Sequence, residues 1–126
     1  MVPSIDLNCD VGEGMGNEAK LFPYLSSCNI AAGGHAGDAD TMKAVASLAR
    51  KHRVRVGAHP SYPDRLNFGR VSLSMGKSEF QESIAAQIGA LTQVLDPLNM
   101  PMHHIKAHGA LYNDLALGGD LAEDYL

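Results

Sequence analysis

Four short apolar stretches alternate along this chain with longer segments, at least three of them helical in pattern, and this alternation constrains the fold most strongly. Strands separated by helices form β-α units, and such units build a parallel sheet because parallel strands need long crossover connections. The sequence therefore predicts the α/β class. The four strands are expected at residues 4–9, about 27–32, 54–58 and 102–106.

Two long helices are expected between these strands. Asp38 is a suitable N-cap for the first, whose apolar residues recur at helical spacing as far as the basic segment 50–53. Ser78 and Gln81 have the spacing of a capping box at the start of the second. The other segments are expected to be broken or irregular: a short helix near 17–25, a loop over 61–76 and a tail from 118 onward.

Four polar residues follow the predicted strands at the same topological position. Asp10, His35, His59 and His108 each lie within a few residues of a strand end. The carboxyl ends of parallel strands form one face, and active sites of α/β folds lie there. Each residue alone could be an incidental loop residue, but the repetition favours a shared site. His59 and His108 adjoin proline and glycine, so we expect their replacement to leave the fold largely intact.

Further side chains are expected on the same face. Lys106 lies two residues before His108, so both point to one side if the strand extends that far, as does His104. At least one residue of the His103-His104 pair is expected to be merely packed or solvated. The long loop contributes residues that either clamp a carboxylate substrate or form a surface ion cluster: Tyr62, Asp64 and Arg70.

Charge and composition narrow the classes of partner. The chain has 10 Lys and Arg against 14 Asp and Glu, a net charge of −4, and no basic cluster, which argues against nucleic acid. Neither a run of about 20 apolar residues nor a secretory leader is found, so no membrane partner and a cytoplasmic location are expected. Two cysteines are too few for a disulfide framework.

Two glycine-containing segments resemble nucleotide motifs only superficially. Residues 12–16 lack the spacing of a dinucleotide fingerprint and carry Glu13 where a phosphate would lie. Residues 76–78 echo the end of a P-loop, but Val71 stands where that motif needs glycine. The chain itself is therefore predicted to have no ATP site.

Seven blocks of the sequence resemble the LamB/YcsF lactam-utilisation family. They occur in order over nearly the whole chain, at residues 5–14, 29–38, 57–60, 62–64, 68–70, 87–91 and 106–113. The chain departs from the family's usual pattern at three positions. Ala32 replaces a cysteine, Gly34 a phenylalanine and Ala107 a proline, which argues against an essential thiol and changes the geometry of strand-end loops.

The resemblance implies a seven-stranded β/α (TIM-like) barrel of the glycoside hydrolase/deacetylase type, which needs about 250 residues. Residues 1–126 would then be a single partial domain, with four β-α units and without the C-terminal half of the barrel. An open half barrel exposes strand edges and an unfilled interior. Self-association or pairing with the missing half is therefore expected.

The family's members are the A subunit of bacterial 5-oxoprolinase, which opens 5-oxo-L-proline (pyroglutamate) to L-glutamate with ATP. The resemblance implies partner B and C subunits that supply the phosphorylation, so ATP acts at the level of the complex. It also suggests roles for residues at the matching positions. Catalytic roles fall to Asp10, His59 and His108, which would orient or deprotonate water, and to Lys106, which would stabilise negative charge. Substrate-binding roles fall to Asn8, Glu13, His35, Asp64 and Arg70.

Two other functions stay open at this point. Barrels of this type often hold a metal with one Asp and two His, so a metal-dependent deacetylase-like hydrolase is one alternative. A non-catalytic module that binds an amino acid or lactam is the other. Which metal, if any, is bound is left open. Chelation is expected to have little effect, because His104 and His108 are expected on a strand and its end rather than on one helical face.

Overall fold

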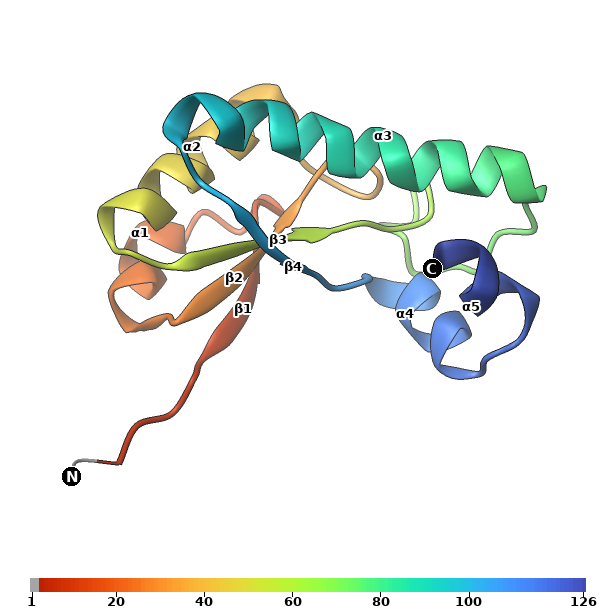
Figure 1. The fold of residues 1–126 in the computed structure, drawn as a ribbon, viewed down its shortest axis with the longest axis horizontal. Helices are drawn as coiled ribbons and strands as arrows, with labels where there is room; N and C mark the ends of the chain where they lie inside the picture. The colour runs from red at the N-terminus through yellow and green to blue at the C-terminus, as the bar shows by residue number, and fades with distance from the viewer. Residues whose placement is uncertain (1–2) are drawn as a thin grey trace.

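The computed structural model describes residues 3–126, and its strands form one parallel sheet in the order β1-β2-β3-β4 (Figure 1). The strands are β1 (Asn8–Val11), β2 (Ser27–Ala31), β3 (Arg55–His59) and β4 (Met102–Ile105). The helices are α1 (Glu18–Leu21), α2 (Ala39–Lys51), α3 (Lys77–Leu95), α4 (Gly109–Ala116) and α5 (Asp120–Tyr125). Two 3-10 turns, η1 (Phe22–Tyr24) and η2 (Asp96–Leu98), complete the order. The α/β class is confirmed.

Helices α2 and α3 lie side by side on one face of the sheet (Figure 1). Alternate strand residues point toward these helices, because side chains in a strand alternate between the two faces. The buried core between the layers is aliphatic and includes Cys28, Ile30, Val56, Ala58, Val45, Ala49, Leu91 and Leu95. Asp38 caps α2 as expected, accepting a hydrogen bond from the backbone N–H of Thr41 at 2.8 Å.

The opposite face of the sheet is polar, and its register places one residue from each strand in a row. Asp10 pairs with Asn29, Asn29 with Gly57, and Gly57 with His104. A Cβ on Gly57 would overlap the His104 ring. The missing side chain therefore makes room for this imidazole to lie across β3 and reach Asn29.

The long loop between β3 and α3 is held against the start of α4 by two glycines. Gly109 has a φ of 58°, and a Cβ there would lie 2.6 Å from the backbone oxygen of Gly69. That same oxygen accepts a hydrogen bond from the N–H of Ala110 at 3.0 Å. Glycine at position 109 thus permits both the left-handed turn and the close backbone approach.

Several predicted element boundaries were wrong. Strand β1 begins at Asn8 rather than at residue 4, and Ile5 is 78% exposed. Helix α3 follows Gly76 without a side-chain cap, and Gln81 instead donates to the backbone oxygen of Asp124, so the capping box is absent. The predicted irregular tail contains α5, and α4 precedes it. No helix within residues 3–126 has the length and apolar character that a membrane crossing requires.

Candidate active site

The strand ends bring together the polar residues that the sequence singles out. Asp10 lies in β1 and His59 is the last residue of β3. The ladder between β3 and β4 continues past the strands, because Lys106 N–H donates to Ala58 and His108 N–H donates to Pro60, both at 2.9 Å. Lys106 and His108 are thereby held at the same edge of the sheet.

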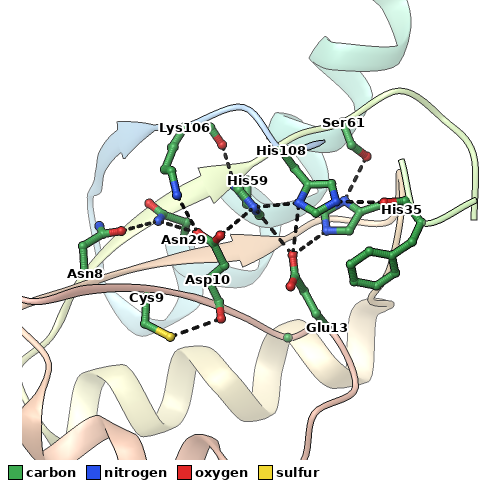
Figure 2. A network of polar contacts seen from close by, with 12 residues as sticks. Asn8, Cys9, Asp10, Glu13, Asn29, His35, His59, Ser61, Lys106 and His108 are labelled. Carbon is green, nitrogen blue, oxygen red and sulfur yellow. Dashed lines mark hydrogen bonds and ion pairs between the residues drawn. The ribbon is translucent and has the colours of Figure 1, made fainter. Parts of the chain in front are cut away.

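Three histidines gather around the carboxylate of Glu13, as Figure 2 shows. Glu13 Oε1 lies 2.7 Å from His35 Nε2 and 3.5 Å from both His59 Nε2 and His108 Nδ1. His59 Nε2 and His108 Nδ1 are 3.1 Å apart. The His35 ring stacks on the His108 ring with centroids 3.7 Å apart. The site is therefore a compact group of imidazoles rather than scattered loop residues.

In two of these rings, the nitrogen that faces away from Glu13, here called the outer nitrogen, contacts a backbone carbonyl. The nitrogen that faces Glu13 is called the inner nitrogen. His59 Nδ1 lies 2.6 Å from the Lys106 oxygen, and His108 Nε2 lies 2.8 Å from the Phe68 oxygen. A carbonyl only accepts hydrogen bonds, so both outer nitrogens carry the proton and donate. In the neutral rings, the nitrogens that face each other and Glu13 then carry lone pairs.

Asp10 lies between the histidine group and the amine of Lys106 (Figure 2). Its Oδ1 accepts from Asn29 Nδ2 at 2.9 Å and from Lys106 Nζ at 3.0 Å, and its Oδ2 is 3.4 Å from His59 Nε2. Burial alone would raise the pKa of this carboxyl, but the contacts with His59, Asn29 and Lys106 outweigh it and lower the pKa. Asp10 is thus an anion at neutral pH.

Burial and neighbouring charges also shift the pKa values of Glu13 and His108. Burial raises the pKa of Glu13, but the hydrogen bond from His35 lowers it overall, together with the positive charge that His35, His59 and His108 carry when protonated. Burial is also the main reason that the pKa of His108 is lowered, and it outweighs the hydrogen bond to Phe68. Neutral pH therefore favours an ionised Glu13 beside a neutral His108.

Asn29 connects the site to the rest of the polar face, a role that its place in the sequence did not reveal. Its side chain is fully buried in β2, where Nδ2 donates to both Asp10 and Asn8. Its Oδ1 accepts from His104 Nε2 at 2.5 Å. An asparagine inside an otherwise apolar strand was the available signal, because buried amides need partners.

A pocket of about 340 Å³ opens beside these groups. All four residues of the predicted catalytic set line this pocket: Asp10, His59, Lys106 and His108. The other lining residues are Ala107, Gly109, Tyr112 and Asn113. Lys106 and Asp10 are partly exposed, with side-chain accessibilities of 41% and 34%. A small polar ligand can therefore reach both charges.

The three loop residues proposed as a carboxylate clamp have separate partners. The buried Tyr62 donates to Asp114 Oδ2 at 2.5 Å, and burial with that contact raises the pKa of the phenol. Asp64 accepts from Asn67 within its own turn. Arg70 is exposed, with its guanidinium 5.1 Å from the centroid of the Phe68 ring. The structure does not join them into one clamp.

His59 and His108 are packed more deeply than their places beside proline and glycine suggested. They are only 1% and 7% exposed, and both outer nitrogens are hydrogen-bonded to backbone. A strand-end position beside proline or glycine did not reveal this burial, because the covering residues come from the distant loop. Phe68 of that loop packs edge-on against both His35 and His108.

Two further residues position the site and were missed. The buried Ser61 lies 2.9 Å from His35 Nδ1 through its hydroxyl oxygen. Gln87 of α3 pairs with both backbone groups of Ser61, at 2.9 Å and 2.8 Å. A Cβ on Gly34 would lie 2.5 Å from the Gln87 amide, so the glycine at this position leaves the space that the amide occupies.

The same cluster has donor atoms suited to a cation. Glu13, His35, His59 and His108 each offer one ligand atom, and the four atoms lie within 4.8 Å of one another. Oxygen and imidazole nitrogen are ligands of several divalent metals.

Comparison with known proteins identifies related sequences over this whole region. The LamB/YcsF family profile matches residues 5–126. A protein from Bacillus cereus that is named as the A subunit of 5-oxoprolinase is 42% identical over 125 residues, which cover 95% of this chain and 49% of the relative. The protein of the same name from Bacillus cytotoxicus is 44% identical, with 95% and 50% covered.

A solved structure has the same fold. The crystal structure of a lactam utilization protein from Thermus thermophilus superimposes with a TM-score of 0.92 and is 37% identical. The similarity covers 98% of this chain and 52% of that protein. The chain thus spans about half the length of the curated relatives and of the solved structure that it matches.

Proposed function

Because this chain belongs to the LamB/YcsF family, we propose that it forms part of the A subunit of a 5-oxoprolinase. The reaction would be the ATP-dependent hydrolysis of 5-oxo-L-proline to L-glutamate. The names of the similar proteins support this choice of substrate. The observation that carries a hydrolytic role is the pocket in which Asp10, Lys106 and His108 meet at the strand ends.

The architecture of the whole protein is also part of the proposal. The four parallel strands would continue into a seven-stranded β/α barrel of the glycoside hydrolase/deacetylase type, with the polar face inside. In such barrels the active site lies at the carboxyl ends of the strands, where the pocket is found here. A cytoplasmic location fits a metabolic enzyme that works in a complex.

A five-membered lactam is a poor electrophile, so the chemistry needs an activation step. The partner B and C subunits would phosphorylate the amide oxygen with ATP, which makes the carbonyl carbon more electrophilic. The present chain would then bind the activated lactam and deliver water to that carbon. The ring C–N bond would break as the nitrogen takes up a proton, and a second water would hydrolyse the resulting acyl phosphate to glutamate and phosphate. This division of labour agrees with the lack of a nucleotide motif in the sequence.

The environments of the ionisable groups suggest separate roles. Asp10 is a weak base because its pKa is lowered, so it would orient water and hold Lys106 rather than remove a proton. A neutral His108, with His59 beside it, is a better proton acceptor while no cation occupies its inner nitrogen. Lys106 faces the pocket and would stabilise negative charge that develops on the substrate.

The remaining predicted residues would bind or position the substrate. Glu13 and His35 form the base of the histidine group, and Asn8 supports Asp10 through Asn29. The substrate-binding roles of Asp64 and Arg70 stay predictions. These two residues would reach the substrate only if the loop moves or if the rest of the protein brings the substrate to them.

Reconstitution with the partner proteins tests the proposal. We expect full-length protein mixed with the B and C subunits to form glutamate from 5-oxoproline and ATP, and to stop when any component is omitted. Residues 1–126 alone should neither hydrolyse ATP nor bind it in calorimetry. Nucleotide binding without the partners would contradict the assigned division of labour. A complete complex that binds the lactam without turnover would favour a non-catalytic binding module.

A further inference from the structure

The inner nitrogens of two histidines face each other, and neither nitrogen carries a proton when its ring is neutral. His59 and His108 both donate their outer N–H to backbone carbonyls, at 2.6 Å and 2.8 Å. The neutral rings then direct lone pairs at each other across 3.1 Å, in a place where both side chains are at least nine-tenths buried. Glu13 Oε1 adds a third electron-rich atom 3.5 Å from each. With neutral rings, three electron-rich atoms thus face one another.

The three atoms form a triangle of the size that a metal ion requires. Its sides are 3.1, 3.5 and 3.5 Å. Zinc lies about 2.1 Å from imidazole nitrogen and carboxylate oxygen, so tetrahedral ligands are separated by about 3.4 Å. The two imidazole rings are inclined to each other by 78°. Two His and one Glu with an open fourth position is also a known ligand set of catalytic zinc.

We propose that Glu13 Oε1, His59 Nε2 and His108 Nδ1 bind one divalent transition-metal ion, with Zn²⁺ as the best match. The surrounding contacts are those that orient metal ligands. Backbone carbonyls fix the tautomers of both histidines, and His35 Nε2 donates to the Glu13 carboxylate at 2.7 Å. His35 is therefore a positioning residue rather than a ligand in this proposal.

The fourth position would face the substrate pocket. Asp10 Oδ2 lies 3.4 Å from His59 Nε2, and Asp10, His59 and His108 all line the pocket. The anionic Asp10 also adds charge that offsets a divalent ion. His104 does not belong to the ligand set, because its Nε2 is already bonded to Asn29.

Metal binding is measurable without substrate, so the test does not depend on the proposed reaction. The full-length protein is stripped with a chelator and titrated with Zn²⁺ by calorimetry at two pH values. We expect one ion per protomer, with tighter binding at the higher pH because the ligands must be deprotonated. His35→Gln should lose about 10–100-fold in affinity, as is typical for residues that orient ligands. Glu13→Gln, His59→Gln and His108→Gln should each lose at least about 100-fold, the upper end of that range.

His52→Gln is the matched control, because His52 lies at the far end of α2 and does not belong to the cluster. It should bind Zn²⁺ like the wild type. Circular dichroism establishes which variants fold, and Glu13→Gln keeps the test valid if the buried histidine variants do not. Equal Zn²⁺ affinity in wild type and Glu13→Gln, or no bound ion at all, would overturn the proposal in favour of a shared proton. A wild-type protein that binds no Zn²⁺ but turns over 5-oxoproline in the complete complex would leave the proposed function intact while this inference failed.

Discussion

Asn29 shows how much of the site depends on one buried amide. Its donor and acceptor groups contact Asn8, Asp10 and His104, which come from β1 on one side and from β4 beyond β3 on the other. A buried polar group without a partner costs about 1–3 kcal/mol. Asn29 therefore fixes the position of the Asp10 carboxylate as well as stabilising the sheet.

We expect Asn29→Ala to destabilise the full-length protein by about 1–3 kcal/mol, because His104 and Asp10 lose a buried partner. Chemical denaturation measures this change. Asn8→Ala is the control, since Asn8 is exposed and lies at the end of the same network. Its effect should stay within about 0.5–1.5 kcal/mol. Equal losses in the two variants would show that the amide network has no special role.

The sequence revealed some residues of the site and concealed others for a physical reason. Asp10, His35, His59 and His108 were recognisable because position after a strand depends only on local pattern. Asn29 and Gln87 act through neighbours that the register or a facing helix supplies. Sequence spacing does not fix that register, so their roles appear only in the folded chain.

At the scale of elements, the packing of β4 against β3 depends on the absence of a side chain at position 57. The His104 ring occupies the place where a Cβ on Gly57 would lie. The ring also needs this place to bond with Asn29. A glycine is therefore needed at position 57 so that the His104 ring has room, although the backbone there has ordinary strand conformation.

Gly57→Ala should destabilise the full-length protein by about 1–3 kcal/mol, the usual cost of overpacking, because the imidazole must move. Gly89→Ala is a matched control in α3, where a Cβ meets nothing within 4 Å. That change should stabilise the helix by about 0.5–1 kcal/mol. Thermal melts of both variants measure the difference, and a neutral Gly57→Ala would show that the ring is not held there.

Helix and strand prediction succeeded where local pattern and burial agree. Helix α2 was predicted because its cap, apolar spacing and basic end all coincide. Residues 4–7 alternate like a strand but come before the paired part of β1. Helix α4 was missed because it begins at a left-handed glycine whose conformation depends on contact with Gly69.

At the scale of the whole molecule, the sheet formed by the described residues has two open edge strands. β1 and β4 each pair on one side only. Apolar side chains are exposed near the β4 edge, including Ile105 at 46% and Tyr112 at 52%. Such edges pair readily with other chains.

Residues 1–126 expressed alone should therefore associate as concentration rises. Sedimentation velocity over a range of concentrations measures this, with the full-length protein as the control. We expect the segment to form dimers or larger species under conditions where the full-length protein keeps one state. A monomer with a sharp melt that does not depend on concentration would instead indicate a self-sufficient small domain.

The central claim is that side chains from separate strands act together on one lactam. The most direct test is glutamate formation from 5-oxoproline by the complete complex with Asp10→Asn, Lys106→Met, the double variant and the His52→Gln control. We predict that each single change lowers turnover by about 10²–10⁴-fold while the complex still assembles. The double variant should lose little more than the worse single variant, because residues that act as a unit are not additive. Near-normal turnover in either single variant, with His52→Gln equally active, would contradict the claim.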